Sequence, residues 1–302
     1  MNNMWGSMAQ YGEIYWPWPI ALYLFLAGLS AGAAIVAVLL KWQGKTGANF
    51  KSAVLLAPIA IIVGLALLVL DLGKPLSFYW ILLKYNFTSV MSIGVALLLV
   101  YTPIVVVYAL FAYKDLAILA PFKGLISSLE KALAKLCEIL ILPLAISVGV
   151  YTGFLLSAVS KILLWDTPIL PILFLVSGLS SGIAASVLCG AIFGKEKDES
   201  TFKLLKLDMF VIIVECLLLV ALFGYLYSSG SAGAEVAGKA LTNGALAAMF
   251  WVFVVGSGMA LPVVMELANG EKMSKNLIIF NTFIVILGVI LLRYYIVYAG
   301  QM

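Results

Sequence analysis

The sequence predicts an all-α integral membrane protein whose eight transmembrane helices form two four-helix bundles related as a parallel repeat. Of its 302 residues, 64% are hydrophobic and only 11% are charged, whereas a soluble domain carries about 25% charged residues. Apolar runs of the roughly 20 residues needed to cross a bilayer follow one another along the whole chain. A five-residue glycine motif recurs in the first and fifth runs. Too little polar surface therefore remains for a separate water-soluble domain.

Charged or Gly/Pro-rich breaks separate the apolar runs and set the predicted helix limits. An aromatic, nearly uncharged segment, residues 1–17, precedes the first run, and it lacks the basic start and cleavage site of a signal peptide. Tryptophan and tyrosine favour the membrane interface, so we expect this segment on the outer surface. The predicted spans are 18–41, 52–71, 88–113, 137–160, 168–194, 204–228, 241–266 and 276–299.

The break between the third and fourth spans has a helical pattern of its own. In residues 121–136 the apolar side chains recur at helical spacing, opposite Lys123, Glu130, Lys131 and Lys135. A segment with this many charges cannot cross the hydrocarbon core, but it can lie along its surface. We therefore predict an amphipathic surface helix here.

The distribution of lysine predicts the orientation in the membrane. Thirteen lysines lie in or beside the connections that follow spans one, three, five and seven, and four lie in the other connections. Basic residues accumulate on the cytoplasmic side of membrane proteins. We therefore expect a multi-pass protein of a prokaryotic cytoplasmic (inner) membrane with both termini outside.

The recurring motif suggests an internal repeat. It reads GLSAG at residues 28–32 and GLSSG at 178–182, in equivalent positions of the first and fifth spans. Four spans per unit give both units the same orientation, as in a parallel repeat. The predicted units are 18–160 and 168–302. Glycines four residues apart also allow close helix packing, so the motifs fit a packing role as well.

Several kinds of redox centre are excluded by composition. The chain has no histidine, and its three cysteines, Cys137, Cys189 and Cys216, are isolated within apolar runs. Haem ligation by histidine pairs and iron–sulfur ligation by cysteine sets are therefore not available. We expect no haem, iron–sulfur cluster or metal in this chain. The net charge of +4 is explained by basic cytoplasmic loops, and no nucleic-acid partner is predicted.

Polar and aromatic residues of the first unit gather on the predicted outer side. Asp71 and Lys74 belong to the sequence DLGKP, which also fits a helix stop with an ordinary interfacial ion pair. Tyr151 fits either a ligand contact or an aromatic side chain packed in a bundle. The full set of candidates on this side is Trp18, Pro19, Tyr23, Gly28, Asp71, Lys74, Asn86 and Tyr151.

Ionisable residues of the second unit lie within predicted spans, where they are costly and are functional candidates. Asp208 and Glu215 are seven residues apart and share a helix face, and Arg293 lies well inside the last span. Together with Glu138 and Glu266, near the inner side, they predict either a proton route or an arginine–carboxylate lock between helices. Glu215 is the expected partner of Arg293 in such a lock.

Four segments resemble the NrfD/polysulfide reductase membrane-subunit family. They are WPWPIALYLFLAGLSAGA (16–33), DLGKP (71–75), YTGFLLSAVSKILLWDTPILPILFLVSGLSSG (151–182) and LRYYIVYAGQ (292–301). The resemblance covers nearly the whole chain, and its 151–182 segment is the most specific.

The resemblance implies a membrane anchor subunit of an anaerobic respiratory oxidoreductase. Such a subunit binds menaquinone or ubiquinone near the outer face and exchanges electrons with an iron–sulfur subunit of the four-cluster ferredoxin type docked there. A catalytic subunit, often molybdopterin-dependent and acting on polysulfide, thiosulfate or tetrathionate, completes the complex. The chain would thus be enzymatic only as part of that assembly.

The resemblance also assigns roles to particular residues. Tyr151 matches the tyrosine that hydrogen-bonds the quinone carbonyl, and Asp71 would lie near the pocket. From its chemistry and its place on the outer side, Asp71 is the candidate for proton exchange with the outer aqueous phase. The wall of the quinone pocket would be the first-span segment 19–28, flanked by Trp18, with Tyr23 and Gly28 within it and with Lys74 and Asn86 nearby. Independently of the resemblance, a proton route through the buried ionisable residues would add proton translocation to this function.

Two other classes of function remain open. A secondary transporter is favoured by the internal repeat and the buried carboxylates. A purely structural anchor would need the same helices but no quinone.

Overall fold

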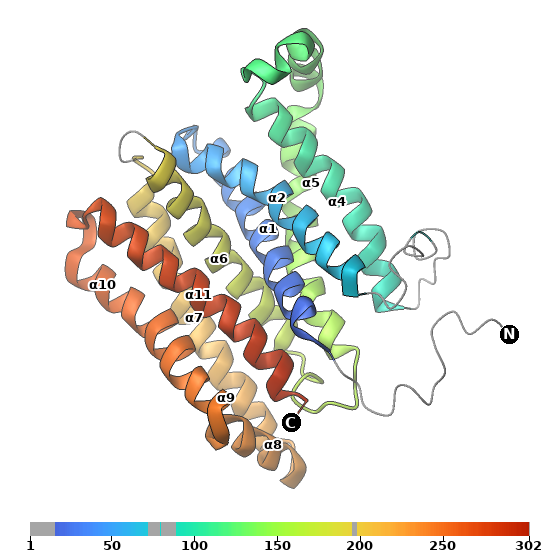
Figure 1. The fold of residues 1–302 in the computed structure, drawn as a ribbon, viewed down its shortest axis with the longest axis vertical. Coiled ribbons are helices and arrows are strands. Elements are labelled where there is room, and N and C mark those ends of the chain that lie inside the picture. The colour runs from blue at the N-terminus through green and yellow to red at the C-terminus, as the bar shows by residue number, and fades with distance from the viewer. Residues whose placement is uncertain (1–15, 72–78, 80–88, 195–197, 302) are drawn as a thin grey trace, which may run out of the picture.

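The computed structural model confirms the predicted all-α membrane fold. It describes residues 16–71, 79, 89–194 and 198–301, with the side chains of Asp71 and Ile118 excepted. Eight helices are long and apolar enough to cross a membrane, and the described residues include no strand. The helices run side by side as one bundle (Figure 1).

The first half of the chain supplies four of these spans. They are α1 (Trp18–Trp42), α2 (Ala48–Asp71), α4 (Val90–Ala112) and α5 (Lys123–Ser157), with the short 3₁₀ helix η3 (Ala117–Phe122) before α5. The predicted surface helix at 121–136 is helical, but it is not a separate element. It continues without interruption into the fourth span as the beginning of the 35-residue α5.

The second half supplies the other four spans and one short additional helix. Its elements are α6 (Leu170–Phe193), α7 (Thr201–Ser228), α8 (Ser231–Thr242), α9 (Gly244–Met249), the π-helical η4 (Phe250–Ala260), α10 (Leu261–Asn269), η5 (Gly270–Lys272) and α11 (Lys275–Ala299). The additional helix, α8, was not predicted from the sequence. Its residues are too few and too polar to span, and the helix buries a face of small residues, Gly233, Ala237 and Ala240.

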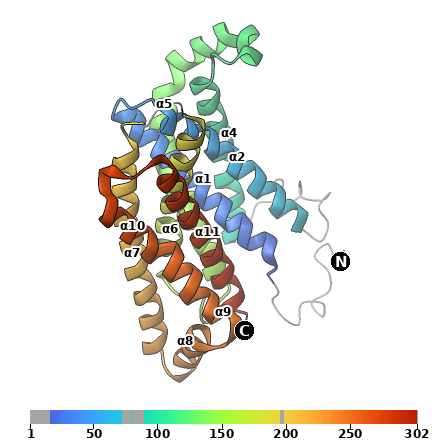
Figure 2. The same cartoon turned by 60° about the vertical axis from the view of Figure 1, so that its left-hand side comes forward.

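The two ends of the bundle differ in composition. We call the end at which α1 begins and α11 ends the tyrosine end, because Tyr23 and Tyr151 lie within two turns of it. The opposite end, with the connections 43–47, 113–122 and 270–274, is the lysine end. In Figures 1 and 2 the beginning of α5 projects beyond the other helices at the lysine end.

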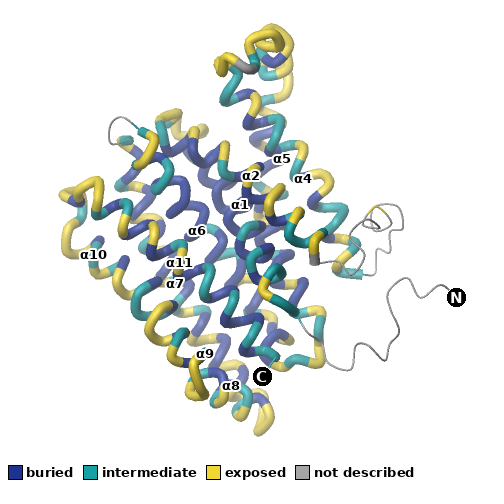
Figure 3. The backbone as a smooth tube through the Cα atoms, in the orientation of Figure 1, coloured by how far each residue is buried: buried dark blue, intermediate teal, exposed yellow. Residues whose placement is uncertain are grey.

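The two glycine motifs pack against each other where α1 crosses α6. A Cβ atom at Gly28 would lie 3.3 Å from the Cα of Gly178, and one at Gly182 would overlap the backbone of Gly32. Only glycine permits so close an approach of two helices. The motifs therefore join the two halves, and α1 is the span with the largest buried share (Figure 3). The parallel repeat itself remains a prediction.

Candidate functional site

Two tyrosines on different helices lie near the tyrosine end. Tyr23 of α1 is completely buried, and its hydroxyl has no hydrogen-bond partner among the described residues. Tyr151 of α5 is also buried and lies close enough to Tyr23 to interact with it electrostatically. A buried hydroxyl without a partner costs free energy, on the order of 1 to 3 kcal/mol. The pair is therefore a place where a polar ligand would be stabilised.

Glycines of the two remaining first-half helices make room for this tyrosine pair. A Cβ atom at Gly94 of α4 would overlap the phenol ring and the hydroxyl oxygen of Tyr151. A Cβ atom at Gly64 of α2 would lie 3.5 Å from the Tyr23 ring, which is ordinary contact. All four first-half spans thus border the pair, and Gly94 fixes how closely Tyr151 can approach α4.

The tyrosine pair has the chemistry to bind a neutral carbonyl compound. A phenol hydroxyl can donate one hydrogen bond and accept another while it stays uncharged near neutral pH. Residues from four apolar helices keep water away from both rings. A neutral ligand with carbonyl acceptors matches the donors of this pair.

The other predicted first-half residues lie in different surroundings. Trp18 is 54% exposed at the start of α1, and Pro19 is half-buried beside it. Gly28 faces Gly178 and the guanidinium of Arg293, on a face of α1 about 140° from the face of Tyr23. Asp71 ends α2, but its side chain lies outside the described residues, as do Lys74 and Asn86 in full.

A second group of unpartnered polar atoms lies in the second half, around Arg293. The Nη2 atom of Arg293 donates to the carbonyl oxygen of Phe174 at 2.7 Å, and its guanidinium carbon lies 3.6 Å from the centre of the Phe174 ring. The side chain is completely buried, and neither Nε nor Nη1 has a partner in the described part of the chain. Two nitrogens of Arg293 therefore remain available to donate hydrogen bonds to other polar groups.

Buried carboxylates extend from Arg293 toward the lysine end. Glu215 interacts electrostatically with Arg293, and Asp208 interacts with Glu215 and Glu266 in turn. The predicted lock is not formed as a direct ion pair, because one oxygen of Glu215 and two nitrogens of Arg293 have no partner among the described residues. Asp208 lies beside Ser180 of α6, and each of these two residues also has an unpartnered oxygen. Such groups in protein interiors are normally satisfied by ordered water.

Glu138 belongs to a different part of the molecule. It lies in α5 near the lysine end, where its Oε2 atom accepts hydrogen bonds from Trp42 Nε1 at 3.0 Å and from Lys135 Nζ at 3.3 Å. This carboxylate is therefore engaged at the edge of the first half, while Asp208, Glu215 and Glu266 lie in the second.

Comparison with known proteins identifies the family. The family model for "Polysulphide reductase, NrfD" matches residues 6–302. The sequence is 47% identical to the C component of polysulfide reductase from Wolinella succinogenes, and the match covers 100% of this protein and 99% of that one. The protein belongs to the NrfD family.

Two further relatives match at lower identity. Protein NrfD of Escherichia coli is 34% identical, with 98% of both proteins covered. The C component of selenate reductase from Mesobacillus selenatarsenatis is 24% identical, with 93% of this protein and 73% of that one covered. The predicted family is confirmed, and the chain is a multi-pass membrane protein similar to subunits of respiratory reductases.

This NrfD-family protein also has site residues that sequence reasoning missed. Gly94 leaves space for the ring of Tyr151, and Phe174 contacts the guanidinium of Arg293. Both are ordinary residues of apolar runs. No spacing signal distinguishes them, since each acts through a partner more than fifty residues away. Among the described residues, no group of three or more histidine, cysteine or acidic side chains could hold a metal ion.

Proposed function

We propose that this chain is the quinone-reactive membrane subunit of a respiratory oxidoreductase complex. It would exchange electrons between a membrane pool of menaquinone or ubiquinone and an iron–sulfur partner on the extracytoplasmic side. The observation that carries this proposal is the pair Tyr23 and Tyr151, buried among four helices with the Tyr23 hydroxyl unpartnered among the described residues. Its membership of a family with reductase subunits supports the assignment.

The residues of the pair have defined tasks in this proposal. A bound quinone would supply the transfer of two electrons and two protons. Tyr151 donates a hydrogen bond to one carbonyl and orients the ring, while Tyr23 completes the hydrogen bonding from α1. The four helices exclude water from the ring. Asp71, at the end of α2, is the proposed group for proton exchange with the outer aqueous phase.

A protein partner follows from the ligands that the sequence lacks. The chain has no histidine pair to hold a haem and no cysteine set to hold an iron–sulfur cluster that could carry electrons away. We place an iron–sulfur subunit of the four-cluster ferredoxin type on the tyrosine end, with a catalytic subunit, molybdopterin-dependent in this proposal, beyond it. The lysine distribution puts the tyrosine end outside the cytoplasmic membrane.

Replacement of Tyr151 by phenylalanine tests the quinone site. Tyr151→Phe removes one hydrogen bond, about 1.4 kcal/mol or a tenfold change in affinity or rate. We expect quinone-linked turnover of the complex to fall about tenfold while assembly is unchanged. The matched control is Tyr295→Phe, which removes a buried hydroxyl that donates to Ala240 O in the second half. Full turnover in Tyr151→Phe, or an equal loss in both variants, would contradict the proposal.

We further propose that the second-half carboxylates exchange protons with the lysine end. Glu266 lies in the last turn of α10 at this end, and Asp208, Glu215 and Arg293 lead from it toward α1. Glu215→Gln and Glu266→Gln should lower the number of protons moved per electron by the complex in proteoliposomes. Glu235→Gln is the control, because Glu235 is an exposed residue of α8 paired with Lys239. An unchanged proton-to-electron ratio in both test variants would remove the route.

A further inference from the structure

The beginning of α5 extends past the membrane-spanning part of the bundle. The helix has 35 residues, so it is about 52 Å long at 1.5 Å per residue, whereas the hydrocarbon core is about 30 Å thick. The first turns of α5 project beyond the neighbouring helices at the lysine end (Figures 1 and 2), and residues 123–136 are the part that precedes the predicted fourth span. We call this part of α5 the projecting segment.

One face of the projecting segment is an exposed row of leucines. Leu125, Leu129, Leu133 and Leu136 are between 37% and 62% exposed. At about 100° per residue they fall within an arc of roughly 80°. The row continues along α5 into Leu140, an exposed residue within the fourth span. The leucines therefore prolong the surface that α5 presents to lipid.

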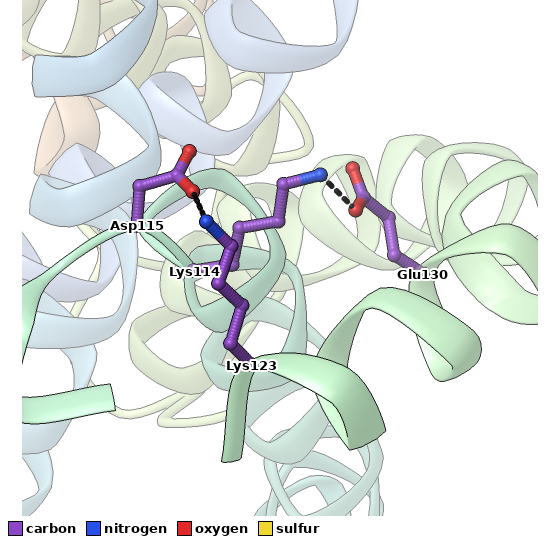
Figure 4. A network of polar contacts seen from close by, with 4 residues as sticks. All are labelled: Lys114, Asp115, Lys123 and Glu130. Atoms are coloured by element: carbon purple, nitrogen blue, oxygen red, sulfur yellow. Dashed lines mark hydrogen bonds and ion pairs between the residues drawn. The ribbon is translucent and has the colours of Figure 1, made fainter. Parts of the chain in front are cut away.

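The charged residues of the projecting segment lie away from this row. Lys123, Glu130, Lys131 and Lys135 are all more than about 90° from its centre around the helix. Two ion pairs join the segment to the chain that follows α4 (Figure 4): Lys114–Glu130 at 2.6 Å and Lys123–Asp115 at 2.8 Å. These pairs engage the charged side chains of the segment and leave the leucine row free.

We propose that the projecting segment lies in the interfacial layer of the bilayer at the lysine end, with its leucine row among the acyl chains and its charged face toward water. Full burial of a leucine side chain contributes about 1.5 to 3 kcal/mol, so four leucines left in water would be a large cost. A lipid occupant is favoured over a protein partner because the row is continuous with a lipid-facing surface. The segment would then anchor the α4–α5 connection at the membrane surface.

Fluorescent labels on opposite faces of the segment test this placement. The three free cysteines are first replaced by alanine, and the environment-sensitive label NBD is attached at Leu129→Cys or, as the control, at Lys131→Cys, in the complex reconstituted into nanodiscs. Lipids with a nitroxide near the glycerol end of the acyl chain should quench the label at 129 and leave most of the emission at 131. Aqueous iodide should show the reverse order.

Two results would overturn the proposal. Equal iodide quenching at both positions would place the leucine row in water. A label at 129 that is shielded from iodide but insensitive to nitroxide lipids would place a protein, either a partner subunit or a second copy of the chain, on the row.

Discussion

The two halves of the molecule bury different kinds of unsatisfied polar group. In the first half, the tyrosine pair presents neutral hydroxyls near one end of the bundle. In the second half, Arg293, Glu215 and Asp208 present ionisable atoms deep in the bundle, and several of these atoms lack partners among the described residues. Both groups are costly without a ligand, but the ligands that would satisfy them differ.

The two kinds of polar group suit two different kinds of ligand within one subunit. Neutral donors suit a neutral carbonyl ring, which has to enter from the lipid and leave again. Ionisable groups in lipid suit water and protons, which lipid itself does not supply. The two halves of the chain meet at Gly28, where α1 contacts both α6 and the guanidinium of Arg293. Substitutions in the two regions should therefore have separable effects, and those at the crossing between them should have the largest.

The crossing of α1 and α6 is the tightly packed contact between the two halves. A side chain at Gly182 would overlap the backbone of α1. Gly182→Leu should therefore destabilise the protein by at least about 3 kcal/mol, measured as loss of the monodisperse peak in size-exclusion chromatography and a lower melting temperature. Gly224→Leu is the control, because a Cβ atom at Gly224 meets nothing within 4 Å. Equal behaviour of the two variants would show that the crossing is not tightly packed.

The ionisable region is tested by a double-mutant cycle on Arg293 and Glu215. Arg293→Gln removes the positive charge that Glu215 experiences, and we expect a loss on the order of 3 kcal/mol in thermal unfolding. The loss should be smaller in a Glu215→Gln background, since no carboxylate is then left uncompensated. Strictly additive effects would mean that the two side chains do not interact.

The geometry of the tyrosine pair is tested by two glycines that carry no chemistry. Gly94→Ala forces Tyr151 to move, whereas the Cβ atom of Gly64→Ala meets Tyr23 in ordinary contact at 3.5 Å and requires only a few tenths of an ångström from Leu26, whose Cβ lies at 3.3 Å. We expect quinone-linked turnover to fall about tenfold in Gly94→Ala, comparable with the loss of one hydrogen bond, and to change little in Gly64→Ala. An unaffected Gly94→Ala variant would argue that the position of Tyr151 is unimportant.

The smallest effect concerns a contact that joins the halves at the lysine end. Asp198 accepts hydrogen bonds from the backbone N–H groups of Asn49 and Ser200 at 3.0 and 2.9 Å. Burial alone would raise the pKa of Asp198, but these donors lower it below its ordinary value. Its contribution is therefore fully present above the ordinary pKa and is lost as the pH falls through the lower folded value.

Asp198→Asn should consequently cost about 1 kcal/mol at neutral pH and progressively less below about pH 4. Thermal unfolding across this pH range measures the difference from the unmodified protein. Asp115→Asn serves as the control, because Asp115 forms an exposed ion pair with Lys123 and such pairs contribute little. A cost for Asp198→Asn that does not depend on pH would contradict this account.

Much of the fold was readable from the sequence, because lipid imposes a simple rule on composition. Every span needs about 20 apolar residues, and the eight predicted spans correspond to the eight helices found. The α8 helix was missed because its small residues resemble a loop. The continuity of α5 was not predicted. The charges at 121–136 indicate where the apolar span ends, but a helix can leave the membrane without ending.

The candidate site was predicted only in part. Tyr23 and Tyr151 were named from the sequence, and both lie near the tyrosine end, close enough to interact electrostatically. Glu215 was the expected partner of Arg293, and the two interact electrostatically. The direct contacts of the guanidinium, with the carbonyl oxygen and the ring of Phe174, were not predicted. A backbone carbonyl exposed at a helix crossing leaves no signature in sequence.

The sequence by itself determined the membrane class, the number of spans, the lack of haem and cluster ligands, and the residues that are costly in lipid. These follow from composition and from the period of a single helix. Only the tertiary structure decided which faces meet: Gly28 on Gly178, Tyr151 over Gly94, and Arg293 on Phe174. Contacts between helices depend on rotations and crossings that are set by packing against several neighbours at once, and no local pattern encodes them.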